Sequence, residues 1–325
     1  MGYGIGTVTK GAGDDTHYQL LDAIKTLAEA NGWVTQRYVG TGSDREWIAK
    51  SLGLSGSEEI YIGIKTYQSV TGDYYNLLLG AFTGYVSGNT FETQPGARYS
   101  GVPAHNNAIT YYVTVNAQRI AFMLKVGTPV YTHGYLGKFF PYARPSEYPL
   151  PLICAGSFNG AEAKRFSDAN QVFPYHGDSV SSYTNFYFRS LDGGWVPPAM
   201  YPFSQGSIPP NSSQSPALAG DPNYYCQVPV NAVYQIESII LHDRVNTSSL
   251  SNNVYGELDG VFFISGFNNA VENVVQVGGS SVVDQSGLTV LQAVDQIIAV
   301  GGRAFVMGQN INRTSWRDFV GLEMA

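Results

Sequence analysis

The residues best suited to acid–base chemistry are few and lie far apart in this chain. Glu257 and Asp259 would share one face of an extended segment, because side chains alternate along a strand. Two carboxylates that face one cleft across about 5–9 Å can hydrolyse a glycosidic bond, and a close pair could also hold calcium. His242 directly precedes Asp243 at the end of an apolar run, so the histidine could act as an oriented base.

Each of these groups also has a simpler explanation. Asp14-Asp15 precedes a predicted helix, where negative charge favours the helix dipole. Glu58-Glu59 suits a turn that enters a strand, and Glu257 with Asp259 suits solvated positions before a buried strand. His242-Asp243 is typical of polar residues at a sheet edge. We favour these structural interpretations, and therefore expect no catalytic residues and no enzymatic activity.

Motifs for cofactors and metals are missing from the sequence. The five histidines are scattered, without zinc-site spacing. Gly2, Gly4 and Gly6 resemble a nucleotide loop only superficially, because that loop follows a strand and opens a helix. There is no P-loop and no Gly-x-Ser-x-Gly elbow. We expect no cofactor and no bound metal.

Composition favours association over nucleic-acid binding. Charged residues make up 13% of the 325 residues, against about 25% in ordinary domains, and the net charge is −7. A net negative chain without basic runs lacks the electrostatic basis for binding phosphates. Aromatic residues also make up 13%, and tyrosine is the commonest of them. Such a surface fits coverage by copies of the chain or by partners, although a neutral β-rich domain would read the same way.

Targeting signals are not evident. No apolar run approaches the length of about 18 residues that a membrane span needs, so we expect no membrane span. The first residues lack the basic and apolar regions of a signal peptide. Two cysteines, Cys154 and Cys226, do not make a disulfide framework, so synthesis in a reducing cytoplasm is expected.

The first 130 residues read as one helix packed on an antiparallel sheet. Residues 1–13 are glycine-rich and are expected to form a flexible or docking arm. A helix is predicted to begin at the capping residues Asp14, Asp15 and Thr16 and to end at Asn31-Gly32, with apolar residues at helical spacing. Strands are predicted over 33–39, 59–67, 74–82, 109–116 and 119–126, with a helix or strand at 46–50 and a long polar loop at 87–108.

The remainder reads as strands separated by long loops. Residues 156–182 and 197–222 are polar or proline-rich and are expected to be irregular. Strands are predicted over 184–189, 234–241, 259–265, 274–277 and 281–283, followed by a terminal strand–turn–strand over 303–322.

The segment from Tyr131 to Ile153 is crowded with aromatics and prolines. The prolines hold it extended, so we expect a connector arm over 131–155 between two β-rich parts. Its aromatic side chains would anchor packing within the subunit or against a neighbouring subunit, and stacking on a sugar is the alternative. The candidate anchors are Tyr135, Phe139, Phe140, Tyr142 and Tyr148.

At these residues the chain resembles a family of tailed-phage virion structural proteins from the tail, baseplate or neck. The likeness covers about half of the chain and is carried by three stretches. They are residues 119–152 with the core Tyr-Leu-Gly-Lys-Phe-Phe-Pro-Tyr-Ala, residues 256–267 with Gly-Glu-Leu-Asp-Gly-Val-Phe-Phe-Ile-Ser-Gly-Phe, and the terminal strand–turn–strand. The opening helix, ending in Asn31-Gly32-Trp33, is similar as well. The resemblance implies a virion component and brings no catalytic residues with it.

Together these observations predict an α+β fold of mostly antiparallel, sandwich-like sheets with one N-terminal helix packed on a sheet. The expected parts are an α+β domain over 1–130, the connector arm over 131–155 and a β-rich domain with long loops over 156–325. The expected function is a structural virion subunit, made in the host bacterial cytoplasm, with itself and other virion proteins as partners. A host-receptor or carbohydrate-binding module is the alternative, and an envelope-degrading enzyme is a weaker one.

Overall fold

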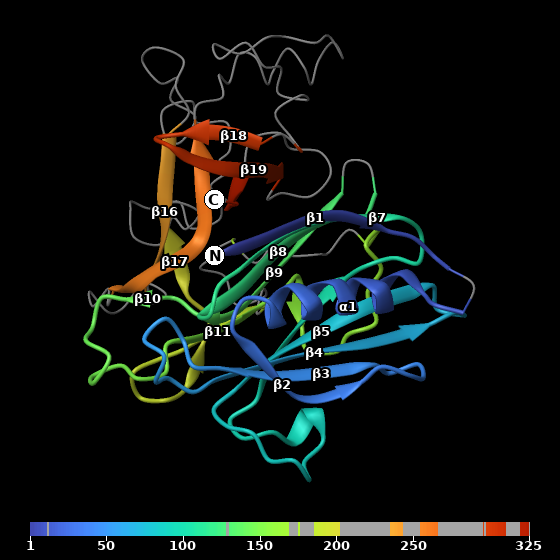
Figure 1. Cartoon of the computed structure of the whole chain (residues 1–325), viewed down its shortest axis with the longest axis horizontal. Coiled ribbons are helices and arrows are strands. Elements are labelled where there is room, and N and C mark those ends of the chain that lie inside the picture. Colours follow the sequence, from blue (N-terminus) through green and yellow to red (C-terminus); the bar gives the residue numbers. More distant parts are fainter. Residues whose placement is uncertain are drawn as a thin grey trace.

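The described part of the chain is mostly antiparallel β-sheet with one α-helix, as the sequence predicted (Figure 1). The fold class is therefore confirmed as α+β and sandwich-like. The computed structural model describes residues 1–11, 13–127, 130–168, 175, 185–201, 235–242, 254–265, 295, 297–309 and 319–324.

Three sheets make up the described part of the chain, and we call them A, B and C. Sheet A has the strand order β1-β7-β8-β9-β11-β13-β14. Its strands are β1 Gly2–Val8, β7 Ile109–Val115, β8 Arg119–Lys125, β9 Tyr131–Lys138, β11 Leu152–Ala155, β13 Phe186–Arg189 and β14 Trp195–Val196.

Sheet B has the order β12-β6-β5-β4-β3-β2, and sheet C has the order β15-β16-β17-β20-β19-β18 with β10 paired to β17. The strands of sheet B are β2 Trp33–Val39, β3 Glu46–Ser51, β4 Ile60–Ser69, β5 Tyr74–Phe82, β6 Arg98–Pro103 and β12 Phe158–Asn159. Those of sheet C are β10 Phe140–Pro141, β15 Ala199–Tyr201, β16 Gln235–His242, β17 Val254–Ser265, β18 Ile297–Val300, β19 Arg303–Gln309 and β20 Phe319–Glu323.

Sheet A is the middle layer, and strand β8 shows why. Its side chains alternate between two cores, as the two-residue period of a strand requires. Ile120 and Phe122 lie in the core shared with sheet B, whereas Ala121 and Met123 lie in the core shared with sheet C. Because both faces are covered, β8 is an almost unbroken apolar run.

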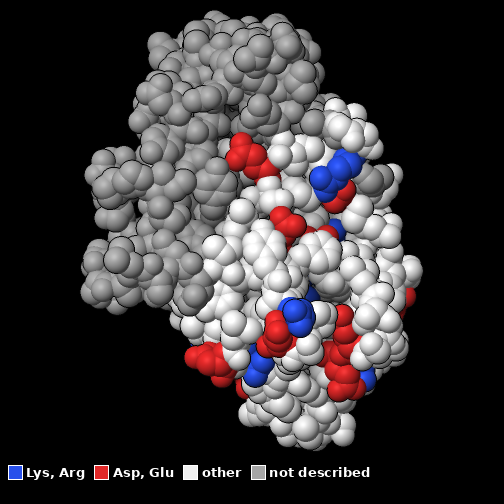
Figure 2. Space-filling view, turned by 90° about the vertical axis from the view of Figure 1, so that its left-hand side faces the viewer, with Lys and Arg blue, Asp and Glu red and all other residues white. Residues whose placement is uncertain are grey.

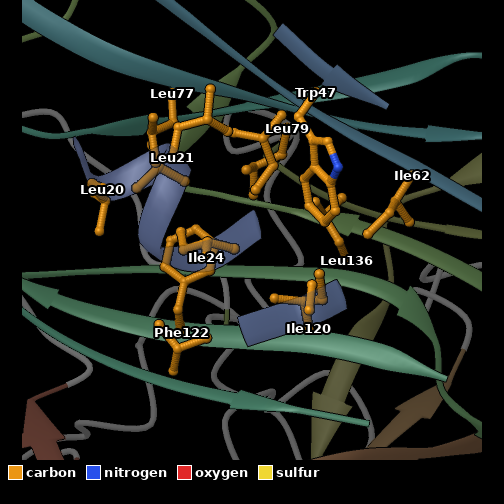
Figure 3. Close-up of a cluster of buried hydrophobic side chains, with 14 of the residues drawn as sticks. Leu20, Leu21, Ile24, Trp47, Ile62, Leu77, Leu79, Ile120, Phe122 and Leu136 are labelled. Atoms are coloured by element: carbon orange, nitrogen blue, oxygen red, sulfur yellow. The ribbon is translucent and has the colours of Figure 1, made fainter. Parts of the chain in front are cut away.

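Helix α1 (Thr16–Glu29) fills the opening between sheets A and B. It buries Leu20, Leu21, Ile24 and Ala28, which recur at helical spacing, against strands of both sheets (Figure 3). Of the three predicted capping residues, Asp14, Asp15 and Thr16, one lies at the N-cap position but does not cap through its side chain. Asp15 occupies the N-cap position without a capping hydrogen bond. Instead the side-chain oxygen of Asn106 accepts a hydrogen bond of 3.1 Å from the amide of Thr16.

Two predictions about segments without regular structure are wrong. Residues 2–8 are not a flexible arm but strand β1, which forms seven regular pairs with β7. The segment 131–155 is not one extended connector arm, because β9 and β11 pair with each other inside sheet A. This aromatic and proline-rich segment therefore contains two strands of sheet A. Its prolines lie only between the two strands, where β10 pairs with β17 of sheet C.

The first 130 residues also differ from the predicted single sheet. Strands β7 and β8 belong to sheet A, whereas β2 to β6 belong to sheet B, so α1 packs between two sheets. The loop predicted over 87–108 contains β6 and the short 3-10 helix η1 (Phe91–Thr93). The loop predicted over 197–222 contains β15, and its residues 202–222 lie outside the described part. The predicted strands at 274–277 and 281–283 also lie there.

Candidate functional site

The five aromatic anchors fall into two groups. Tyr135, Phe139 and Tyr148 are 0 to 2% exposed and lie in the core between sheets A and C. Phe140 and Tyr142 are 39% and 57% exposed. The sequence placed all five in one aromatic segment, but only the tertiary structure separates internal anchors from surface ones.

The buried anchors pack against each other and against β13. The ring of Phe139 meets those of Tyr148 and Phe188 edge-on, with centroids 5.7 and 6.0 Å apart. The hydroxyl of Tyr148 donates to the carbonyl oxygen of Arg189, so its polar end is satisfied inside the protein. These contacts hold the arm to its own subunit.

The exposed anchors are presented from a fixed backbone. Phe140 is paired with Glu257 across β10 and β17, and the amide of Tyr142 donates to the carbonyl oxygen of Tyr255 over 2.9 Å. The backbone at this point is therefore held by sheet C while the two rings face solvent. Exposed aromatic rings on a rigid backbone are typical of contact surfaces, because little entropy is lost on docking.

Tyr135 connects the arm to the buried charges. Its hydroxyl donates to the carbonyl oxygen of Lys138 over 3.0 Å and accepts a hydrogen bond of 3.2 Å from the amide of Asp259. Complete burial, together with the nearby Asp259 carboxylate, raises the pKa of Tyr135 well above its ordinary value. The hydroxyl is thus a neutral structural link between sheets A and C.

Asp259 is held by a buried ion pair with Arg119, and this corrects the interpretation of Asp259 as a solvated residue. The Nε atom of Arg119 lies 3.3 Å from Oδ2 of Asp259, and the guanidinium side chain is fully buried. Asn116 donates to the same carboxylate oxygen over 2.7 Å. Because Oδ2 contacts both Arg119 on β8 and Asn116 in the turn before it, Asp259 ties sheet C to sheet A.

Backbone geometry reinforces this tie. Gly260 has φ +72°, and a Cβ added there would overlap the Arg119 guanidinium. The pairing of β17 with β16 shifts register between Ser238 and Ile240, opposite this point. This irregularity in β17 directs the side chain of Asp259 toward the interface between sheets A and C. Asp259 is accordingly buried while Glu257 is only half-buried, so the two carboxylates lack the common open face that the less favoured alternative, a paired-acid site, requires.

In the other sequence-adjacent carboxylate pairs, each carboxylate contacts a different partner. Asp14 contacts Arg45, whereas Asp15 accepts a hydrogen bond of 2.8 Å from the side-chain amide of Asn106. Glu58 lies 3.0 Å from the ammonium of Lys138, and Glu59 pairs with Lys50 on β3. These carboxylates hold neighbouring segments together.

The histidines do not converge in the described residues. His17 is fully buried beside the rings of Tyr18 and Tyr75, with Nε2 2.6 Å from the side-chain oxygen of Gln68. Burial lowers the pKa of His17 to about 4. The predicted His242-Asp243 pair cannot be placed, since the side chain of His242 and the whole of Asp243 lie outside the described residues.

A polar cluster around Asp295 was not predicted from the sequence. Asp295 accepts hydrogen bonds from the hydroxyls of Tyr112 and Tyr131, at 3.0 and 2.9 Å, and pairs with the ammonium of Lys125. Burial and the adjacent carboxylate raise the pKa of both tyrosines. The donors come from three strands of sheet A, so their proximity depends on strand register, which local sequence patterns do not reveal.

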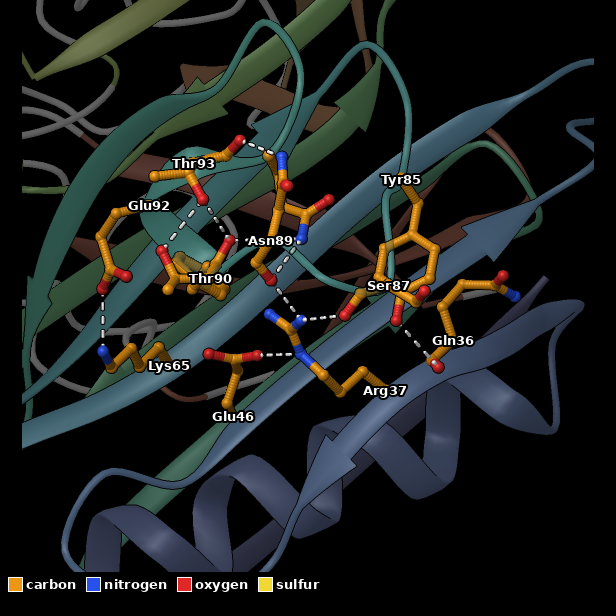
Figure 4. Close-up of polar contacts among 12 residues, drawn as sticks. Gln36, Arg37, Glu46, Lys65, Tyr85, Ser87, Asn89, Thr90, Glu92 and Thr93 are labelled. Atoms are coloured by element: carbon orange, nitrogen blue, oxygen red, sulfur yellow. Dashed lines mark hydrogen bonds and ion pairs between the residues drawn. The ribbon is translucent and has the colours of Figure 1, made fainter.

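The loop between β5 and β6 is held by a network of hydrogen bonds, and several of its residues are drawn in Figure 4. The side chain of Gln94 is 3% exposed; it accepts from the amide of Val86 over 2.9 Å and donates to three carbonyl oxygens of the loop. Arg37 on β2 donates to the carbonyl oxygen of Asn89 over 2.6 Å and to Glu46 over 2.5 Å. The ring of Phe91 seals the loop onto sheet B. The loop is thus built as a fixed projection.

Charge is dispersed on the face shown in Figure 2. Lysines, arginines and acidic residues form small mixed groups there, separated by uncharged surface. Among the described residues, no group of three or more histidine, cysteine or acidic side chains is arranged to hold a metal ion. In the same part of the chain, no helix is both long enough and apolar enough to cross a membrane.

Comparison with known proteins gives no family assignment. No protein-family model matches the chain, and no curated protein matches its sequence.

Proposed function

We propose that this chain is a structural subunit of a tailed-phage virion, located in the tail, baseplate or neck, and that it assembles into a symmetric oligomer. The observation that carries the proposal is the pair of exposed rings, Phe140 and Tyr142, held on a backbone that sheet C fixes. Large exposed aromatics that the fold holds in place are suited to protein contacts.

The sequence resemblance supports the same proposal through its location. Its stretches include β8, β9, β17 and β20, which line the core between sheets A and C. The stretches that carry the resemblance therefore lie along the core that joins sheet A to sheet C. Low charge density and scattered surface charges also favour extensive contacts with copies or partners. The absence of catalysis, cofactors and nucleic-acid partners stays a prediction.

Two measurements test this proposal. Light scattering coupled to size exclusion should give an oligomer for the purified chain, and mass spectrometry of purified particles should detect the chain in a fixed stoichiometry. An averaged density map of the particle should then accommodate sheets A, B and C. A chain that stays monomeric and is missing from purified particles contradicts the proposal.

A binding role for the loop between β5 and β6 is the second candidate. Gln94 and Arg37 fix this loop, and the side chain of Val86 in it is 46% exposed. A rigid loop on a sheet scaffold is a common way to present a binding surface. Glycan-array and whole-cell binding assays test this role, and a Val86→Asp variant should reduce any signal. Signals that do not change in this variant would exclude the loop.

A further inference from the structure

Strand β1 is an unprotected edge of sheet A. It forms seven regular pairs with β7 and is the last strand of the sheet among the described residues. No charged side chain, proline or bulge occurs between Met1 and Thr9. Natural proteins usually block such edges, because the unpaired backbone groups recruit another strand.

The other edges of sheets A and B are protected in the described part of the chain. Strand β2 carries Arg37 and has a register shift between Thr35 and Arg37. Strands β12 and β14 are two residues long. Among the edges of sheets A and B that the structure describes, β1 is the one that is long, regular and uncharged.

One face of β1 is apolar and uncovered. Met1, Tyr3 and Ile5 are 57%, 51% and 45% exposed, whereas Tyr112, opposite Ile5 on β7, is 6% exposed. Sheet C therefore covers β7 but leaves β1 open. A strand added to the edge would cover these side chains.

The opposite face of β1 borders a groove beside α1. The helix runs antiparallel to the strand: Gly2 lies near Asn31 at the helix end, and Gly4 lies near Leu27 (Figure 1). Gly4 lines a groove of about 450 Å³ that is open along the helix. Its lining includes Gly4, Ala23, Thr26, Leu27, Ala30 and Tyr111.

We propose that a second copy of this chain docks on this edge, with the two β1 strands paired antiparallel and the two α1 helices side by side. The inference rests on the self-association proposed above and names its surface. A two-fold axis perpendicular to the sheet keeps both helices on one face. With Ile5 opposite Ile5 of the second copy, Tyr3 lies opposite Thr7, and Gly4 lies opposite Gly6.

The geometry of α1 fits this pairing. The helix contacts both β1 and β7, so its axis lies about one strand spacing, roughly 5 Å, from the two-fold axis. The two helices would then be about 10 Å apart, which is within the usual packing distance of about 8–10 Å. Small side chains, Ala23, Thr26 and Ala30, face the groove and permit that approach.

Charge at this edge does not oppose a second copy. The net charge of −7 opposes association in general, but β1 brings no like charge to the seam. Asp22 is the acidic side chain at the groove, and it is compensated within its own subunit. It accepts a hydrogen bond from Tyr38, and its Oδ2 atom lies 3.9 Å from Arg45.

Ile5→Lys is the variant that tests the edge. Ile5 is exposed, so the lysine should leave the fold intact but place two like charges opposite each other at the two-fold axis. We expect the dimer dissociation constant, measured by analytical ultracentrifugation, to rise at least ten-fold. Val34→Lys is the matched control, because Val34 is 61% exposed on the bulged edge strand β2. Circular dichroism and melting temperature verify that both variants fold.

Cysteine cross-linking tests the register. Facing residues of antiparallel strands have Cα atoms about 4.5–5.5 Å apart, which suits a disulfide. Ile5→Cys should therefore give a covalent dimer under mild oxidation, as should a mixture of Tyr3→Cys and Thr7→Cys. Tyr3→Cys alone should not, and the wild-type chain with Cys154 and Cys226 is the control.

The outcomes separate this inference from the proposed function. An oligomer that Ile5→Lys leaves unchanged overturns β1 pairing, while assembly itself stands. A wild-type chain that is monomeric at all concentrations also overturns the pairing, and particle mass spectrometry then decides the virion role. Weakening by Ile5→Lys with the predicted cross-links supports the β1 interface.

Discussion

At the scale of single residues, buried polar side chains in this protein act as ties between layers. Arg119 and Asp259 form the clearest example, because a fully buried guanidinium and a carboxylate meet across sheets A and C. Burial makes the pair costly to break, since removal of one partner leaves an uncompensated charge in a low-dielectric interior.

A double-mutant cycle measures this tie. We expect Asp259→Asn and Arg119→Met each to lower the free energy of unfolding by about 3–5 kcal/mol. The double variant should lose much less than the sum of the two, because neither charge is then left alone. Urea denaturation gives the four values. Additive losses would mean that the two side chains do not interact.

His17 predicts the pH dependence of stability. Burial lowers its pKa to about 4, so the folded protein binds this proton less readily than the unfolded chain, whose histidine pKa is 6.5. The contribution of neutral His17 is complete above pH 6.5 and is lost as the pH falls toward 4. The loss should be about 1.4 kcal/mol per pH unit, or about 3 kcal/mol in total.

Variants isolate this effect from the titration of other groups. His17→Gln should flatten the decline in unfolding free energy between pH 6.5 and 4, measured by urea denaturation at several pH values. His105→Gln is the matched control, because His105 is only partly buried and should change the slope less. An unchanged slope in His17→Gln would show that other groups govern acid sensitivity.

At the scale of elements, the segment between β9 and β11 contributes both to internal packing and to the exposed surface. Phe139 and Phe140 are neighbours in sequence, yet one is fully buried and the other is 39% exposed. Strand alternation at β10 sends the two rings to opposite sides. Internal packing and surface contact can thus be tested separately.

Alanine substitutions separate the two roles. Phe139→Ala should lower the free energy of unfolding by about 3–5 kcal/mol, because it leaves a cavity in the A–C core. Phe140→Ala should leave monomer stability almost unchanged and weaken assembly. Thermal unfolding and light scattering are the measurements. Equal destabilisation by both variants would contradict the assignment of Phe140 to the surface.

At the scale of the whole molecule, sheet A connects the core that it shares with sheet B to the core that it shares with sheet C. Phe122 and Met123 are adjacent on β8 but lie in different cores. The predicted domains over 1–130 and 156–325 therefore both supply strands to one sheet. A shared sheet implies that the two cores unfold together.

Thermal unfolding tests this coupling. Phe122→Ala and Met123→Ala should each shift one and the same transition to lower temperature, since each removes buried apolar volume from β8. Far-UV circular dichroism and tyrosine fluorescence should follow coincident curves. Two separate transitions, each sensitive to only one variant, would instead support two independent domains.

Local patterns in the sequence predicted much of this fold. The helical spacing of Leu20, Leu21 and Ile24 predicted α1, because one apolar stripe suffices to define a buried helix face. Alternating or continuous apolar runs predicted most strands of sheet B and the pair β7 and β8. Tyr3 and Ile5 alternate with glycines in the same way, but the glycines favoured a flexible arm.

The sequence by itself determined the fold class, the helix and the aromatic segment, because these depend on composition and short-range periodicity. Only the tertiary structure decided which sheet each strand joins, which of the five anchors are buried, and that Arg119 meets Asp259 across 140 residues of chain. Strand partners and edges are set by long-range pairing, and that pairing brings together residues whose separation in sequence carries no periodic signal.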